Sequence, residues 1–168
     1  MPRWLTYMTT LDEINRRGDL VRYEPALEVN EQLDRVAYVT SICKRWMEEV
    51  LPLEPMDWDK SLKPDEQVDQ LFADFVLGRA MVPTEDFKHY PPIAWAMKTR
   101  DVRVFGYFPR KSTFVAVCGA MRKDLQGHDG QTTNQLFRPM LEAVRQFARN
   151  LDLDPPKYLT GVTLNAVL

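Results

Sequence analysis

Three short alternating segments within residues 92–124 constrain the fold of this chain more than any other feature. Residues 93–98 and 102–108 alternate apolar side chains with others, and residues 114–118 are a continuous apolar run. Alternation with a period of two is typical of a strand with one buried face, and a short apolar run is typical of a strand buried on both faces. The polar breaks between the segments have the length of hairpin loops. The sequence therefore predicts a meander of three strands.

Many cations lie on or beside these segments, where the accompanying carboxylates are Asp101 and Asp124. A twisted sheet rimmed by cations suits a ligand that carries phosphate groups. A solvated sheet face with ordinary Lys and Arg alternation would leave the same pattern, so both interpretations stay open. The cations are Lys98, Arg100, Arg103, Arg110, Lys111, Arg122 and Lys123.

Other segments have the three- and four-residue apolar spacing of amphipathic helices. Capping residues and Pro or Gly at their ends support these helix predictions. We expect the first two long helices to form an antiparallel hairpin that lies on the sheet. The predicted helices are residues 11–17 after Thr10, residues 31–50 after Asn30, a helix from Pro64 to the end signal Gly78, and residues 135–150.

The order of the predicted elements is strand, helix, helix, three strands and helix. Residues 20–27 supply the first strand, which Pro25 restricts to a sheet edge or a bulge, and residues 162–167 are a candidate for a last strand. This order predicts an α+β fold with a mainly antiparallel sheet and a helical hairpin packed on it. We expect a single domain over residues 1–168, with extensions at residues 1–19 and 152–168.

The charge of the chain is unevenly distributed. Residues 1–92 contain 11 Lys and Arg against 18 Asp and Glu, a net charge of −7, whereas residues 93–168 contain 11 against 6, a net charge of +5. Such a division indicates either internal complementarity or a basic site carried on an acidic scaffold.

The cysteines and the hydropathy of the chain indicate the cellular compartment in which we expect it. The two cysteines, Cys43 and Cys118, lie far apart in apolar contexts, which argues against a disulfide framework or a zinc site and favours the cytoplasm. The first residues lack the pattern of a signal peptide, and no apolar run approaches the length that spans a bilayer, so we expect no membrane partner.

Three parts of the meander resemble, in order, three strand motifs of one known family. Residues 94–98 (Ala-Trp-Ala-Met-Lys) correspond to Leu-Trp-Glu-Leu-Arg, and residues 102–108 (Val-Arg-Val-Phe-Gly-Tyr-Phe) correspond to Val-Arg-Val-Phe-Tyr-Phe-Phe. Residues 118–123 (Cys-Gly-Ala-Met-Arg-Lys) match the spacing of His-Gly-Phe-x-Lys-Lys, with Cys118 in place of His. The family is the phage-related, HigB-like branch of the RelE-type ribonuclease toxins, and the chain resembles a divergent member of it.

The resemblance implies an RNA-binding protein that cleaves messenger RNA, usually on the ribosome, with no metal ion and no cofactor. It also implies control by a cognate antitoxin. Cations would hold the scissile phosphate and stabilise its charge. Carried over by position, these would be Lys98, Arg103, Arg122 and Lys123, with Tyr107 stacking on a base or taking part in acid–base chemistry.

Further residues complete the predicted site. Arg100, Arg110 and Lys111 are expected to contact RNA as parts of the same basic surface. His128 lies in a Gly-flanked loop after the basic strand end, where a general base would be well placed, although an exposed loop histidine is the simpler interpretation.

A non-catalytic function is the competing hypothesis. The chain would then be an interaction module from a phage or mobile element that binds and modulates a bacterial protein. Its acidic helices and its apolar C-terminal tail would form the contact surface.

Overall fold

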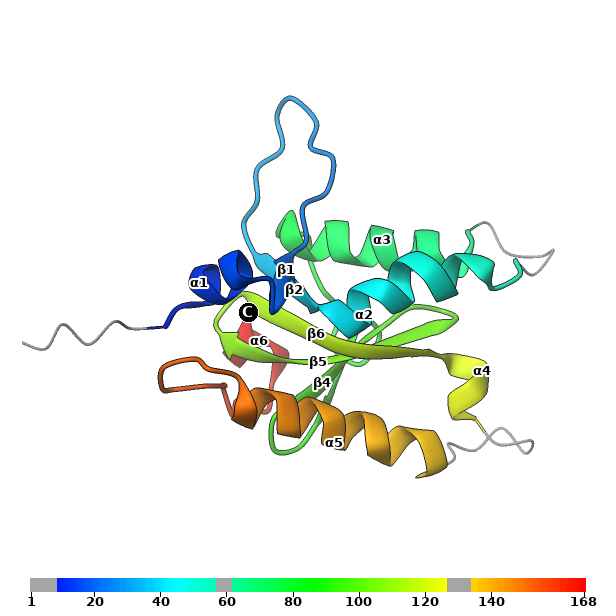
Figure 1. Cartoon of the computed structure of the whole chain (residues 1–168). Helices are drawn as coiled ribbons and strands as arrows, with labels where there is room; N and C mark the ends of the chain where they lie inside the picture. The colour runs from blue at the N-terminus through cyan, green and yellow to red at the C-terminus, as the bar shows by residue number, and fades with distance from the viewer. Residues whose placement is uncertain (1–8, 57–61, 127–133) are drawn as a thin grey trace, which may run out of the picture.

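The computed structural model describes residues 9–56, 62–126 and 134–168 of the chain. Within these residues, six strands form one mixed sheet in the order β1-β2-β6-β5-β4-β3 (Figure 1). Neighbouring strands are antiparallel except for β2 and β6, which are parallel. The predicted α+β class and the mainly antiparallel sheet are therefore confirmed. The strands are β1 (Leu20–Arg22), β2 (Val36–Thr40), β3 (Phe87–Tyr90), β4 (Ala94–Lys98), β5 (Val102–Arg110) and β6 (Thr113–Met121).

Helices cover both faces of this sheet. Figure 1 shows α2 and α3 on one face and α5 on the other, with α1 beside the edge that β1 forms. A π-helical turn, η1, and a 3₁₀ turn, η2, continue α2 without a break. The helical segments are α1 (Leu11–Arg17), α2 (Ser41–Arg45), η1 (Trp46–Val50), η2 (Leu51–Leu53), α3 (Pro64–Val76), α4 (Arg122–Leu125), α5 (Asn134–Asn150) and α6 (Leu164–Val167).

The predicted meander is confirmed as β4, β5 and β6. Antiparallel pairing places Lys98 opposite Arg103 and Val102 opposite Met121. Gly106 lies at an irregularity between β5 and β6, and a Cβ atom there would meet the carbonyl oxygen of Val115 at 2.1 Å. The two longest strands therefore approach each other closely at a position where only glycine fits.

The local signals at helix ends have the expected geometry. The Thr10 hydroxyl accepts a hydrogen bond from the amide of Glu13 at 3.2 Å, which satisfies a free amide in the first turn of α1. Gly18 and Gly78 follow α1 and α3 with φ values of 88° and 74°, the left-handed conformation that ends helices without a Cβ penalty. The predicted helices 11–17, 64–77 and 135–150 are confirmed to within a residue or two.

The prediction of a helix over residues 31–50 is wrong in its first half. Residues 36–40 form β2, which lies between β1 and β6, and the helix begins only at Ser41. Thr40 makes this transition, because its hydroxyl accepts a hydrogen bond from the amide of Cys43 at 3.1 Å. A strand covered on both faces has a continuous apolar run, which periodicity alone does not distinguish from a buried helix.

Three smaller expectations also need correction. The strand expected at residues 20–27 is limited to β1, although it does lie at the sheet edge. The connection before Ile93 contains an unexpected edge strand, β3. The tail forms the short helix α6 instead of a strand, because a helical turn brings Leu164 and Val167 to the same side, where both are buried.

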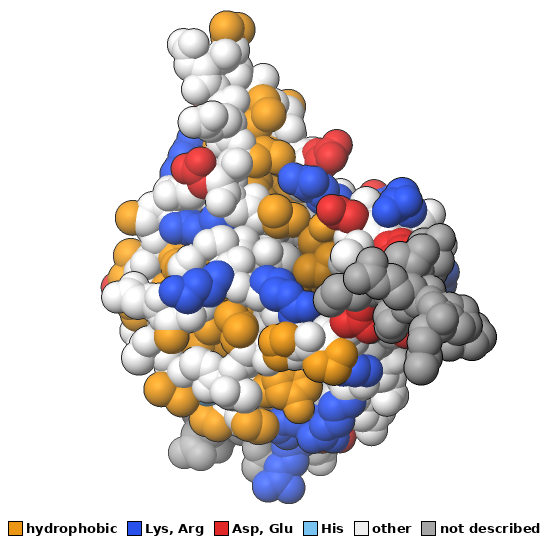
Figure 2. Space-filling view, turned by 90° about the vertical axis from the view of Figure 1, so that its left-hand side faces the viewer, with side chains coloured by type: hydrophobic (Ala, Val, Ile, Leu, Met, Phe, Trp, Pro, Cys, Tyr) orange, Lys and Arg blue, Asp and Glu red, His pale blue; other side chains and the backbone are white. Residues whose placement is uncertain are grey.

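The middle of the connection between β1 and β2 projects from the rest of the molecule (Figure 1 and Figure 2), whereas its ends contact α3 through Tyr23 and Asp34. The side chains of Leu27 and Val29 in this segment are exposed. Among the described residues, no helix combines the length and the apolarity that crossing a membrane requires.

Two hydrophobic cores lie on the two faces of the sheet. The core beneath α2 and α3 is rich in aromatic rings, and Phe75 of α3 is its centre, with ring centroids 5.8, 6.3 and 6.2 Å from those of Phe87, Phe108 and Phe114. The core beneath α5 contains Phe105 and Tyr107. Ile14 of α1 and Val167 of α6 are buried too, so the terminal segments contribute to the cores.

We expect Phe75→Ala to lower the free energy of unfolding by about 3–5 kcal/mol, because it removes a fully buried ring and leaves a cavity among three others. Urea denaturation measures this loss. Leu53→Ala, at a side chain that is 81% exposed, is the control and should change stability by less than about 0.5 kcal/mol. Equal effects of the two substitutions would contradict the placement of the core.

Candidate nucleic-acid interface

Four cations from four different elements line one small hollow at an end of the sheet. They are Lys88 of β3, Lys98 of β4, Arg103 of β5 and Arg122 of α4. The hollow has a volume of about 150 Å³, and we refer to it as the cation pocket. Its remaining lining consists of Tyr90, Leu125, Gln126 and Phe137.

Strand register places these side chains together. Lys98 and Arg103 are directly paired between β4 and β5, and Lys88 is paired with Ala96, which precedes Lys98 by two residues and so shares its face. This is the face that α5 covers. Arg122 joins the group because its backbone amide donates a hydrogen bond to the carbonyl of Asp101, at 2.6 Å, immediately after β6 ends.

Backbone carbonyls hold two of the cations in position. The ammonium group of Lys98 donates a hydrogen bond to the carbonyl of Thr84. The guanidinium of Arg103 donates to the carbonyl of Thr99 and, at 2.8 Å, to that of Val102. Within the described parts of the chain, none of the four cations is ion-paired with a carboxylate. Their positive charge is therefore available to a ligand.

The cations repel one another. Burial lowers the pKa of Lys98, and the charges of Arg103, Lys88 and Arg122 lower it further, while Glu85 opposes this effect. Burial and then Arg122 lower the pKa of Arg103 in the same way, while Tyr90 and Asp101 oppose this effect. Bringing these groups together without an anion is unfavourable, which is typical of sites arranged for a charged ligand.

An aromatic wall borders the cation pocket. Tyr90 and Phe137 meet edge to face with ring centroids 4.9 Å apart, and Phe137 also contacts Phe105 at 5.7 Å. The ammonium of Lys88 lies 5.2 Å from the centre of the Tyr90 ring. Burial raises the pKa of Tyr90, which keeps its hydroxyl protonated, while Arg103 acts in the opposite direction. The pocket thus combines phosphate-binding groups with rings that can contact a sugar or a base.

Of the residues that the sequence proposed, Lys98, Arg103 and Arg122 are brought together, whereas other cations lie elsewhere. Lys123 points away, toward Glu54, the residue that follows η2, with which it forms an ion pair at 2.6 Å. Arg100 lies in the turn between β4 and β5 and lines a neighbouring hollow beside α3. It does not line the cation pocket.

Arg110 and Lys111 lie at the other end of β5. The guanidinium of Arg110 donates hydrogen bonds to the carbonyls of Pro156 and, at 3.2 Å, Asp154, so it fastens the C-terminal segment. Lys111 occupies the exposed hairpin turn that follows. Figure 2 views the molecule from this side, where Lys and Arg side chains are spread among hydrophobic ones.

Tyr107 lies on the same face of β5 as Arg103 but inside the core beneath α5. Its side chain is fully buried, its hydroxyl has no hydrogen-bond partner in the described residues, and burial raises its pKa. Its ring is therefore not exposed to a nucleotide in this conformation. His128, the candidate general base, lies outside the described residues.

Sequence reasoning missed Lys88, Tyr90 and Phe137. The first two lie on β3, in a segment interpreted as a connection because Pro83, Pro91 and Pro92 surround it. The alternation from Phe87 to Tyr90 was the available signal, but four residues are too few for a secure strand prediction. Phe137 joins the pocket only through the docking of α5.

Comparison of the chain with protein-family models, with curated proteins and with solved structures found no match.

Lys98→Met should change how stability depends on pH. The pKa of Lys98 is lower in the folded protein than in the unfolded chain, where it is near 10.5, so the unfolded chain binds more protons between these two values. The free energy of unfolding of the wild type should therefore rise with pH across that window, relative to Lys98→Met. Urea denaturation at several pH values from about 8 to 10.5 measures this difference.

Lys111→Met, which leaves the cation pocket complete, is the control and should follow the wild type. A wild type and a Lys98→Met variant with the same dependence on pH would show that the repulsion in the pocket is negligible.

Proposed function

We propose that this protein binds single-stranded RNA at the cation pocket and cleaves the strand at the phosphate held there, without a metal ion. The observation that supports this proposal most is the convergence of four cations on one hollow, none of which is ion-paired with a carboxylate in the described parts of the chain. Phosphate oxygens accept charge-assisted hydrogen bonds from Lys and Arg, and they would offset the mutual repulsion of the cations.

The size of the pocket favours a single phosphate group. Its volume of about 150 Å³ equals that of about five water molecules at roughly 30 Å³ each. A nucleotide would therefore place its phosphate in the hollow and its base at the rim, beside Tyr90 and Phe137. Unpaired bases are accessible to such rings, whereas bases within a duplex are not, so single-stranded RNA is the expected ligand.

The groups in the pocket suit cleavage by the neighbouring 2′-hydroxyl. The 2′-oxygen forms a bond to phosphorus and the bond from phosphorus to the 5′-oxygen breaks, which leaves a 2′,3′-cyclic phosphate and a 5′-hydroxyl. Arg103 and Arg122 stabilise the negative charge that develops on the phosphate. Lys98 takes the proton of the 2′-hydroxyl in its deprotonated form, which its lowered pKa makes more accessible, and Tyr90 gives a proton to the leaving oxygen.

The resemblance to the RelE-type toxins supports the same function. Its three motifs lie on β4, on β5 and at the junction of β6 with α4, which are the elements that carry Lys98, Arg103 and Arg122. This support comes from the three motifs, since the observed elements from β1 to α5 include β2, β3 and α4, which the expected order lacks. Messenger RNA on the ribosome is then the substrate, and an antitoxin is the controlling partner.

Arg103→Met should weaken the binding of a fluorescently labelled single-stranded RNA by about tenfold, because it removes charge-assisted hydrogen bonds to phosphate. It should also lower the slope of log affinity against log salt by about 1, the effect of one lost phosphate contact. Fluorescence anisotropy in buffer with EDTA measures both quantities. Lys111→Met, which removes an exposed cation at the other end of β5, is the matched control.

Cleavage is tested separately, by electrophoresis of the same RNA. We expect products with a 2′,3′-cyclic phosphate end, and we expect none from RNA with a single 2′-deoxy substitution at the cleaved position, although that RNA should still bind. RNA that binds but stays intact, on and off the ribosome, would limit the function to binding. Equal RNA affinity of the wild type and Arg103→Met would reject the cation pocket as the RNA site.

A further inference from the structure

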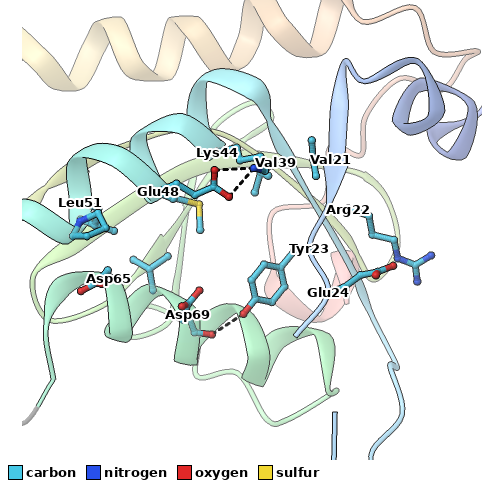
Figure 3. Close-up of a pocket in the computed structure, with 13 residues that line it drawn as sticks. Val21, Arg22, Tyr23, Glu24, Val39, Lys44, Glu48, Leu51, Asp65 and Asp69 are labelled. Carbon is cyan, nitrogen blue, oxygen red and sulfur yellow. Dashed lines mark hydrogen bonds and ion pairs between the residues drawn. The ribbon is translucent and has the colours of Figure 1, made fainter. Parts of the chain in front are cut away.

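The opposite face of the sheet contains a larger pocket with a different character. It lies between β1, the α2–η1–η2 segment and the first half of α3, and has a volume of about 470 Å³ (Figure 3). This volume is within the range of natural small-ligand sites. Its apolar lining consists of Val21, Val39, Met47, Leu51, Pro52 and Val68.

One side of this pocket is acidic. Asp65 and Asp69 lie one turn apart on α3, and the Oδ1 atom of Asp65 is buried without a hydrogen-bond partner among the described residues. Burial raises the pKa of Asp69, and the charge of Asp65 raises it further. A buried carboxylate oxygen without a partner is unfavourable, so a positively charged group placed here would be stabilising.

Tyr23 connects the acidic side to β1. Its hydroxyl donates a hydrogen bond to the backbone carbonyl of Asp69 at 3.2 Å, as the dashed line in Figure 3 marks. Burial and then the charge of Asp69 raise the pKa of Tyr23 to about 12, so this hydroxyl stays neutral. The ring of Tyr23 thereby forms an apolar wall beside the carboxylates and adds no negative charge.

The nearby cations leave the two aspartates uncompensated. Lys44 forms an ion pair with Glu48 at 2.6 Å, and Figure 3 shows this pair on the α2–η1 side of the pocket. Arg22 lies on the other side of Tyr23 from Asp69 in the same view. In the described part of the chain, neither Asp65 nor Asp69 is ion-paired with a cation.

We propose that this pocket binds an aliphatic cation, with its ammonium or guanidinium group against Asp65 and Asp69 and its carbon chain over Val21, Val39 and Met47. An apolar floor with carboxylates at one end matches an extended amine in both shape and charge. The same chemistry occurs in a free polyamine and in a lysine or arginine side chain of a partner protein. The site is separate from the cation pocket and does not depend on the proposed RNA function.

Isothermal titration calorimetry of the RNA-free protein tests this proposal. The probes are spermidine, a short peptide with one lysine between leucines, the same peptide with glutamine in place of lysine, and 1,6-hexanediol. We expect spermidine, the lysine peptide or both to bind, and the two neutral probes to bind at least about tenfold more weakly, since they lack the charge-assisted contacts. Binding of spermidine alone would identify a free polyamine as the ligand, and binding of the peptide alone would identify a partner side chain. If both bind, the tighter one identifies the source.

Asp65→Asn and Asp69→Asn should each weaken this binding by about tenfold. Each substitution removes repulsion between like charges, so the fold should be kept, and the thermal midpoint verifies this. Asp74→Asn is the control on the same helix, since Asp74 lies outside the pocket and pairs with Arg79. Arg103→Met should bind amines as the wild type does, whatever its effect on RNA. The proposal would be overturned if neither cation binds, if the neutral probes bind equally well, or if both Asp→Asn variants bind normally.

Discussion

The pairing of β5 with β6 is the interaction on which the rest of the structure depends. These nine-residue strands lie at the middle of the sheet, and both of their faces are covered, by α3 on one side and α5 on the other. Gly106 allows close approach of the two strands, and Gly119 accommodates the ring of Trp46, which a Cβ atom would meet at 2.3 Å. Because this hairpin is packed so tightly, it fixes the positions of the neighbouring strand ends. The side chains directly after those ends are fixed with them.

Both pockets lie where this packed centre gives way to the periphery. The cation pocket is at the end where β6 passes into α4. The pocket lined by Asp65 and Asp69, which we call the amine pocket after its proposed ligand, is beside the short edge strand β1. In each pocket, groups of like charge lie close together on elements that the hydrophobic cores stabilise. The stability of the cores offsets the unfavourable repulsion between these groups. The carbonyls that bind Lys98 and Arg103 hold these side chains in place without neutralising them.

The two pockets draw their charged residues mainly from different halves of the chain. Asp65 and Asp69 come from the acidic half and line the amine pocket, whereas Lys98, Arg103 and Arg122 come from the basic half and line the cation pocket. The sheet separates the two pockets, so they present opposite charges on opposite faces. One ion pair between the halves joins Lys123 to Glu54.

The sequence alone determined the features that local periodicity and capping encode: the β4–β6 meander, α1, α3 and α5, and the mainly antiparallel α+β class. Carried over by position from the family resemblance, it also singled out Lys98, Arg103 and Arg122, which lie on or directly after the meander strands and line one pocket. Only the tertiary structure decided that residues 36–40 form β2, since a strand buried on both faces has no distinguishing period. The tertiary structure also decided that Lys123 pairs with Glu54 and that Lys88 lines the cation pocket from the short strand β3. Side-chain direction depends on strand register, which local sequence does not specify.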